Sequence, residues 1–124
     1  MHQFLFLGSI NAALAIMAGA FAAHGLKSRL SDHYLEVFQT GAQYHFYHAL
    51  ALLILGLVIQ QFPEQGLLKW SGYLFLLGIL LFSGSLYTLS ITGISWLGAI
   101  TPLGGVAFIA GWLMMAVVFF KINV

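Results

Sequence analysis

Residues Ala42 to Phe62 read Ala-Gln-Tyr-His-Phe-Tyr-His-Ala-Leu-Ala-Leu-Leu-Ile-Leu-Gly-Leu-Val-Ile-Gln-Gln-Phe, and this stretch decides the fold class. As an α-helix it rises about 31 Å, which matches the roughly 30 Å hydrocarbon core of a bilayer. Its opening, Gln43 to Leu50, carries the only dense polar chemistry in the chain. We therefore predict a membrane-spanning helix that begins with a polar stretch.

The composition extends this prediction to the whole chain. Of 124 residues, 61% are hydrophobic and 6% are charged, whereas soluble domains are about half apolar and a quarter charged. Lipid or a partner subunit must therefore cover most of the surface. A net charge of +1 is too small and scattered for nucleic-acid binding, and the absence of cysteine excludes disulfides and thiolate metal sites.

The apolar runs predict an all-α protein, a single transmembrane domain over residues 1–124 that folds as an integral membrane antiparallel four-helix bundle. Spans are expected at about residues 4–23, 42–62, 70–89 and 102–120. Ser31 or Asp32 should begin the second helix, so that the residues before Ala42 form an amphipathic interfacial lead. Pro63 should end that helix, and Thr101 with the proline after it should begin the fourth.

Two features of the termini and loops bear on topology. The first apolar run lacks a basic region before it, so we expect an uncleaved span rather than a signal peptide. Lys27 and Arg29 lie in a loop on one side of the membrane, and Lys69 and Lys121 lie on the other. The two sides therefore have equal numbers of basic residues, which do not decide the orientation. If the first helix dominates, the loop after it is cytoplasmic and both termini face outward.

Small residues recur at helical spacing and predict faces where helices approach closely. Asn11 shares such a face with Ala15 and should find a hydrogen-bond partner on a neighbouring helix. The residues expected at helix contacts are Ala15, Gly19, Gly78, Ser85, Gly104 and Gly111.

Four motifs in order carry a family resemblance: Gly19 to Lys27, Gln39 to Leu50, Leu81 to Tyr87, and Thr101 to Gly105. Together they resemble the small four-helix membrane family filed as domain of unknown function 423, with bacterial inner (plasma) membrane proteins and transmembrane-protein-256-like relatives in eukaryotes. The resemblance implies a multi-pass protein of the bacterial inner membrane. It implies no activity. It favours His24 and His48 over His45 as candidate site residues.

The polar stretch supplies a candidate site. Its side chains spread over an arc of roughly 200° on a helical wheel, so they cannot all face lipid at low cost. The length of the second span places His45 and His48 within about two turns of the membrane boundary, near His24 at the end of the first span. The candidate ligand-binding residues are His24, Gln43, Tyr44, His45, Tyr47, His48 and Asn11.

Several functions remain open on these residues. The main expectation is a small structural or accessory membrane protein, in which the polar groups belong to the boundary and bond to neighbouring helices. Self-association through the small-residue faces, or packing with a partner membrane protein, would fit that role. Enzyme function is least expected, because the chain has no nucleophile elbow, phosphate loop or paired carboxylates.

The sharper alternative is a ligand-binding or redox component organised around His24, His45 and His48. These three imidazoles could hold a metal or haem, or could bind the head group of a quinone or lipid. The sequence leaves the cofactor unspecified. A further alternative is a small oligomeric transporter that passes protons or solutes along His and Tyr.

Overall fold

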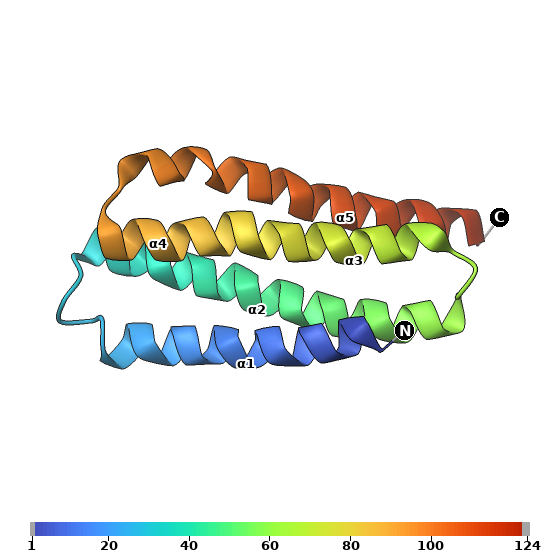
Figure 1. The fold of residues 1–124 in the computed structure, drawn as a ribbon, viewed down its shortest axis with the longest axis horizontal. Coiled ribbons are helices and arrows are strands. Elements are labelled where there is room, and N and C mark those ends of the chain that lie inside the picture. The colour runs from blue at the N-terminus through green and yellow to red at the C-terminus, as the bar shows by residue number, and fades with distance from the viewer. Residues whose placement is uncertain (1, 123–124) are drawn as a thin grey trace.

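The computed structural model describes residues 2–122. Its elements are α1 (Gln3–His24), α2 (Asp32–Gln61), α3 (Gly66–Gly78), a π-helical turn η1 (Ile79–Ser83), α4 (Gly84–Thr92), a 3₁₀ turn η2 (Ser95–Ala99) and α5 (Thr101–Ile122). In Figure 1, α3, η1 and α4 form one continuous rod, and the chain runs up and down through antiparallel neighbours.

The predicted all-α membrane fold is confirmed. Within residues 2–122 no strand is found, and four helical segments are long and apolar enough to cross a bilayer. They are Gln3–His24, Asp32–Gln61, Gly66–Thr92 and Ser95–Ile122. Residues 1, 123 and 124 of the predicted domain lie outside the described residues.

The helix ends follow local signals. The Ser31 hydroxyl oxygen caps α2 by accepting a hydrogen bond from the Tyr34 backbone N–H at 3.2 Å, so the predicted start of this helix is confirmed. The same helix ends two residues before Pro63. The rod of α3, η1 and α4 extends beyond the predicted limits of 70 and 89, and it stops at Gly93, whose φ of 71° is left-handed.

The lead into α2 packs against the bundle. It is continuous with the rest of α2, which has 30 residues and is therefore about 45 Å long. Phe38 is buried in a small core with Ala22 and Leu26, and its ring lies 4.8 Å from that of Tyr87. One side of the lead is thus enclosed by α1 and α4.

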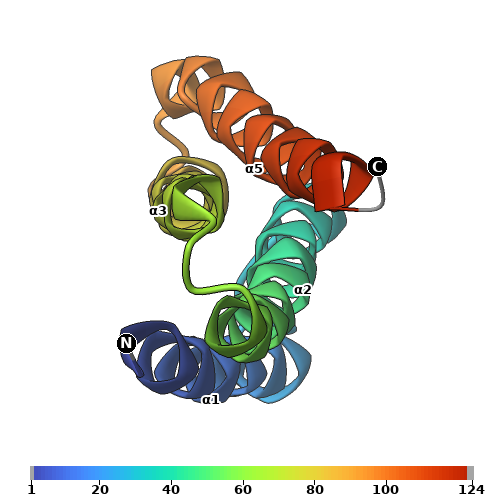
Figure 2. The same cartoon turned by 90° about the vertical axis from the view of Figure 1, so that its right-hand side faces the viewer.

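Helix α1 joins the bundle through one stripe only. Its buried residues, Phe4, Gly8, Ala15 and Ala22, recur at spacings of four and seven, which places them on a single face. A Cβ at Gly8 would lie 2.9 Å from the Ala49 carbonyl oxygen, so only glycine allows α1 and α2 to approach this closely. Figure 2 shows α1 against α2, with α3 and α5 on the other side of α2.

The contact between α5 and the α3–η1 segment is equally tight. A Cβ at Gly104 would overlap the backbone of Phe82, and one at Gly111 would lie 2.7 Å from the Phe75 ring. Gly78 is similarly close to a phenylalanine ring of α5. These three glycines therefore lie where two helices meet.

Two further predicted packing residues differ in their surroundings. The Ser85 hydroxyl lies 3.0 Å from the Phe82 carbonyl, to which it donates, and 2.6 Å from the Thr101 hydroxyl, so it joins α4 to the start of α5. Apart from the adjacent backbone of α1, no atom lies within 4 Å of the place where a Cβ of Gly19 would lie. Gly19 makes no close helix contact within the described chain. Its predicted packing role would therefore require a helix from another molecule.

Candidate functional site

His45 links three helices through its two ring nitrogens. Its Nε2 lies 2.8 Å from Asn11 Oδ1 on α1, and its Nδ1 lies 2.9 Å from the Tyr87 hydroxyl on α4. The Asn11 amide nitrogen donates to the Leu7 carbonyl at 2.8 Å, so its oxygen is the acceptor. As a neutral ring, His45 then donates from Nε2 and accepts the Tyr87 hydroxyl proton at Nδ1.

His48 has the opposite arrangement. Its Nδ1 lies 2.8 Å from the Tyr44 carbonyl oxygen, which can only accept, so this nitrogen carries the proton. Its Nε2 then accepts from the Trp112 indole N–H at 3.1 Å. The ring stacks on Phe108 with centroids 3.5 Å apart and planes 8° from parallel, and Phe75 closes another side at 5.4 Å.

His45 and His48 both lie about halfway along α2. They are 13 and 16 residues beyond Asp32 in the 30-residue α2. Asn11 is eight residues from the start of α1, and Trp112 is the twelfth of 22 residues in α5. The expected position of both histidines near the membrane boundary stays a prediction. Along α2 they lie near mid-length, because the lead before them packs against the bundle.

His24 lies far from the other two histidines. It is an exposed residue at the end of α1, 13 residues beyond Asn11 and hence about 20 Å further along the axis. Among residues 2–122, no group of three or more His, Cys, Asp or Glu could hold a metal ion. The predicted set of His24, His45 and His48 is thus not brought together.

The inner histidines also have their coordinating lone pairs in use. A metal binds neutral imidazole through the nitrogen that lacks a proton. In His45 that nitrogen accepts from Tyr87, and in His48 it accepts from Trp112. Coordination would require breaking an interhelical hydrogen bond in either case.

The other candidate residues of α2 face outward. The Gln43 amide donates to the Tyr47 hydroxyl at 2.6 Å, and the Tyr44 ring lies 5.0 Å from that of Phe82. Tyr47 is 49% exposed. This outer group continues along α2 as an exposed face, which we call the outer stripe, made of Gln43, Tyr47, Leu50, Ile54 and Leu57.

The site contains residues that sequence reasoning missed, namely Tyr87, Trp112 and Phe108. Tyr87 ends one of the family motifs, but no local pattern pairs it with His45. Trp112 offered one usable signal, because an indole N–H in an apolar segment needs an acceptor. Several α2 side chains near mid-length can accept, and the structure places His48 against the indole.

The comparisons with known proteins find relatives that are named as membrane proteins. The family profile described as "Protein of unknown function (DUF423)" matches residues 18–105. The chain is 54% identical over 117 residues to the UPF0382 membrane protein YwdK of Bacillus subtilis strain 168, with 94% of this chain and 95% of the relative covered. No solved structure matches the chain significantly.

Staphylococcal relatives align along almost their full length. The UPF0382 membrane protein SAB0533 of Staphylococcus aureus is 48% identical over 121 residues, with 98% of both chains covered. SSP2132 of Staphylococcus saprophyticus is 47% identical over 122 residues, with 98% of this chain and all of the relative covered. The chain therefore belongs to the DUF423 family and is a multi-pass bacterial membrane protein.

Proposed function

We propose that the protein is a small accessory membrane protein that associates with a second copy of itself along the outer stripe of α2. The observation that carries this proposal is the Gln43–Tyr47 pair, which lies exposed near the middle of a membrane helix. Polar groups at that depth are costly in lipid and usually face protein.

The inner polar residues support a structural role rather than a reactive one. Within residues 2–122, every buried side-chain nitrogen and oxygen has a hydrogen-bond partner. The histidines use their nitrogens to join α2 to α1, α4 and α5. Interhelical hydrogen bonds of this kind stabilise membrane bundles.

The outer pair has hydrogen-bonding capacity left for another molecule. The Gln43 amide N–H donates to the Tyr47 oxygen, which leaves the Gln43 carbonyl oxygen as an acceptor and the Tyr47 hydroxyl proton as a donor. The two groups are complementary to each other. In a two-fold dimer each Tyr47 could donate to the partner's Gln43, as an isologous interface requires.

The flank of α2 that carries the outer stripe has room for a helix. The residues of α2 that contact α1 include Ala49, Leu53 and Gly56, whereas His48 points to α5. At 100° per residue the outer stripe faces away from both directions. Figure 2 shows α1, α3 and α5 arranged around part of α2, which leaves one flank of α2 without a helix beside it in the described chain.

Cysteine crosslinking in native membranes tests the dimer directly, because the chain contains no cysteine of its own. Leu50→Cys lies on the outer stripe with 40% of its surface exposed, and Leu14→Cys is a matched control on α1 with 49% exposed. We expect oxidation to convert Leu50→Cys to a disulfide-linked dimer and to leave Leu14→Cys monomeric. Equal crosslinking of both variants would contradict the proposal.

Removal of the polar groups tests the hydrogen bonds. Tyr47→Phe should weaken dimerisation in mild detergent by about threefold for each bond lost, given about 0.6 kcal/mol per interhelical hydrogen bond. Ile54→Val on the same stripe is the matched control. A monomer in nanodiscs, or a crosslink to a protein of different mass, would overturn self-association.

A further inference from the structure

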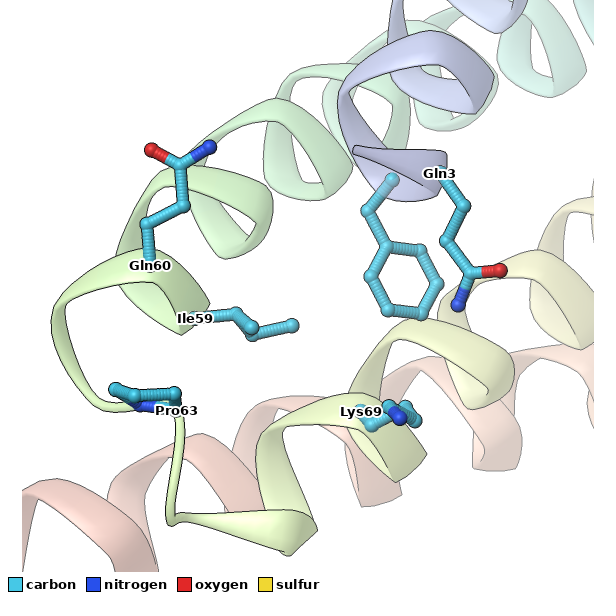
Figure 3. Close-up of a pocket in the computed structure, with 6 residues that line it drawn as sticks. Gln3, Ile59, Gln60, Pro63 and Lys69 are labelled. Carbon is cyan, nitrogen blue, oxygen red and sulfur yellow. The ribbon is translucent and has the colours of Figure 1, made fainter. Parts of the chain in front are cut away.

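A cavity of about 340 Å³ opens at the end of the bundle opposite His24. It lies where the start of α1, the end of α2 and the start of α3 meet, and it is lined by Gln3, Phe4, Ile59, Gln60, Pro63 and Lys69. Figure 3 shows Ile59 projecting into the space between Gln3, Pro63 and Lys69. None of the candidate residues around the histidines belongs to it.

The lining changes from apolar to polar across the cavity. Phe4, only 1% exposed, lies one residue inside the start of α1, and Ile59 lies two residues inside the end of α2; they form the apolar part. Gln3, Gln60 and Lys69 are exposed and form the polar part. A phospholipid presents the same order, with a charged phosphate outside and ester-linked chains inside.

The surroundings place the cavity at the depth of lipid head groups. Trp70 and Tyr73, next to Lys69 in the sequence and on the helix surface, are both exposed. Such aromatic residues mark the membrane–water interface. Tyr73 also receives a 3.3 Å hydrogen bond from the Gln3 amide, which holds the start of α1 beside α3 at this level.

The charge of the lining selects the sign of the ligand. Lys69 is the only charged residue among the six, so the cavity contains a cation and no carboxylate. The positive end of the α3 dipole lies three residues away, at Gly66. A phosphate has a counter-charge here, whereas the amine of a zwitterionic head group has none.

From these features we propose that the cavity binds the glycerophosphate head group of an anionic phospholipid, with Lys69 contacting the phosphate. Its volume suits a head group and not a whole lipid, since pockets for small ligands begin at about 300 Å³. The acyl chains would extend over the exposed apolar surfaces of α1 and α2. Basic pockets between membrane helices bind anionic lipids in this manner.

Native mass spectrometry in mild detergent tests the site, with phosphatidylglycerol and phosphatidylcholine of identical acyl chains as probes. We expect phosphatidylglycerol to be retained preferentially. Lys69→Gln should lower that retention about fivefold, the effect of one lysine charge near a membrane surface. Lys121→Gln is the matched control, because Lys121 is an exposed cation at the same end of the bundle outside the lining.

A second variant distinguishes the effect of the cavity volume on lipid binding from the effect of the Lys69 charge. Ile59→Phe narrows the apolar part and keeps Lys69, and it should also reduce phosphatidylglycerol retention while the helical circular dichroism stays unchanged. Equal retention of the two lipids, an equal loss in Lys121→Gln, or undiminished binding in Ile59→Phe would overturn the proposal. Displacement by millimolar inorganic phosphate would identify a small-anion site and would likewise overturn it.

Discussion

His45 and His48 lie three residues apart on the same helix and have different surroundings. His45 belongs to a polar chain that runs from Asn11 on α1 to Tyr87 on α4. His48 lies among aromatic rings, stacked on Phe108 and bonded to Trp112 of α5. The comparison shows that an i, i+3 pair can join one helix to different neighbours, although the two positions are only about 60° apart around the helix axis.

The largest effect is expected from His48→Ala. This change removes a stacked ring and the acceptor for the Trp112 indole, and it leaves a cavity between α2 and α5. We expect a loss of about 3 kcal/mol in the free energy of unfolding. Unfolding by SDS in mixed micelles, followed by tryptophan fluorescence, measures it. Leu14→Ala, at an exposed position of α1 outside the outer stripe, is the control, and an equal loss there would contradict the assignment.

His45→Leu should cost less, about 1 to 2 kcal/mol, because it replaces the ring by a side chain of similar size and leaves two polar partners unbonded. Those partners are Asn11 and Tyr87. Adding Tyr87→Phe removes one of the unbonded groups, so the double variant should be more stable than the sum of the two single losses predicts. Additive losses would indicate that no buried group is left unpaired.

The hydrogen bond between His48 and Trp112 can be separated from the stacking. His48→Phe keeps an aromatic ring against Phe108 and removes the acceptor nitrogen, and Trp112→Phe removes the donor. A double-mutant cycle on the same unfolding measurement should give a coupling of about 0.6 kcal/mol, as for other hydrogen bonds between membrane helices. A coupling near zero would assign the contribution of His48 to stacking alone.

The last prediction concerns the ring nitrogens that carry the protons of His45 and His48, and it involves no change in stability. ¹⁵N NMR of labelled protein in nanodiscs should find His45 protonated at Nε2 and His48 protonated at Nδ1, because their acceptors are Asn11 and a backbone carbonyl respectively. Two identical tautomers would show that one of these hydrogen bonds is wrongly assigned.

The elements of the fold could be predicted because their signals are local. Ser31 caps a helix whatever lies around it, and Pro63 ends one for the same reason. The apolar runs were long enough to identify four spans. The π-helical turn could not be foreseen, since Ile79–Ser83 has the composition of any apolar helix.

The candidate site was predicted in residue type and not in position. Its depth depends on how far the lead of α2 is enclosed, and that follows from the packing of Phe38 between α1 and Tyr87. Length counting cannot detect such a contact, because it treats every residue before Ala42 as outside the bilayer. Similarly, His24 ended up separate because Asn11, and not the end of α1, lies opposite His45.

The π-helical turn has a consequence for how the chain tolerates the deletion of a residue. In this turn the Gly84 N–H bonds to the Ile79 carbonyl, five residues back, so the turn holds one residue more than an α-helix needs. Removing one codon, that of the outward-facing Leu80, which is 67% exposed, would restore regular α-helix and leave Phe75 and Tyr87 on their present sides. Deletions inside membrane helices normally rotate every later residue by about 100°. We therefore expect the loss of one residue at this turn to leave the fold in place, whereas the same loss elsewhere in the helix would not.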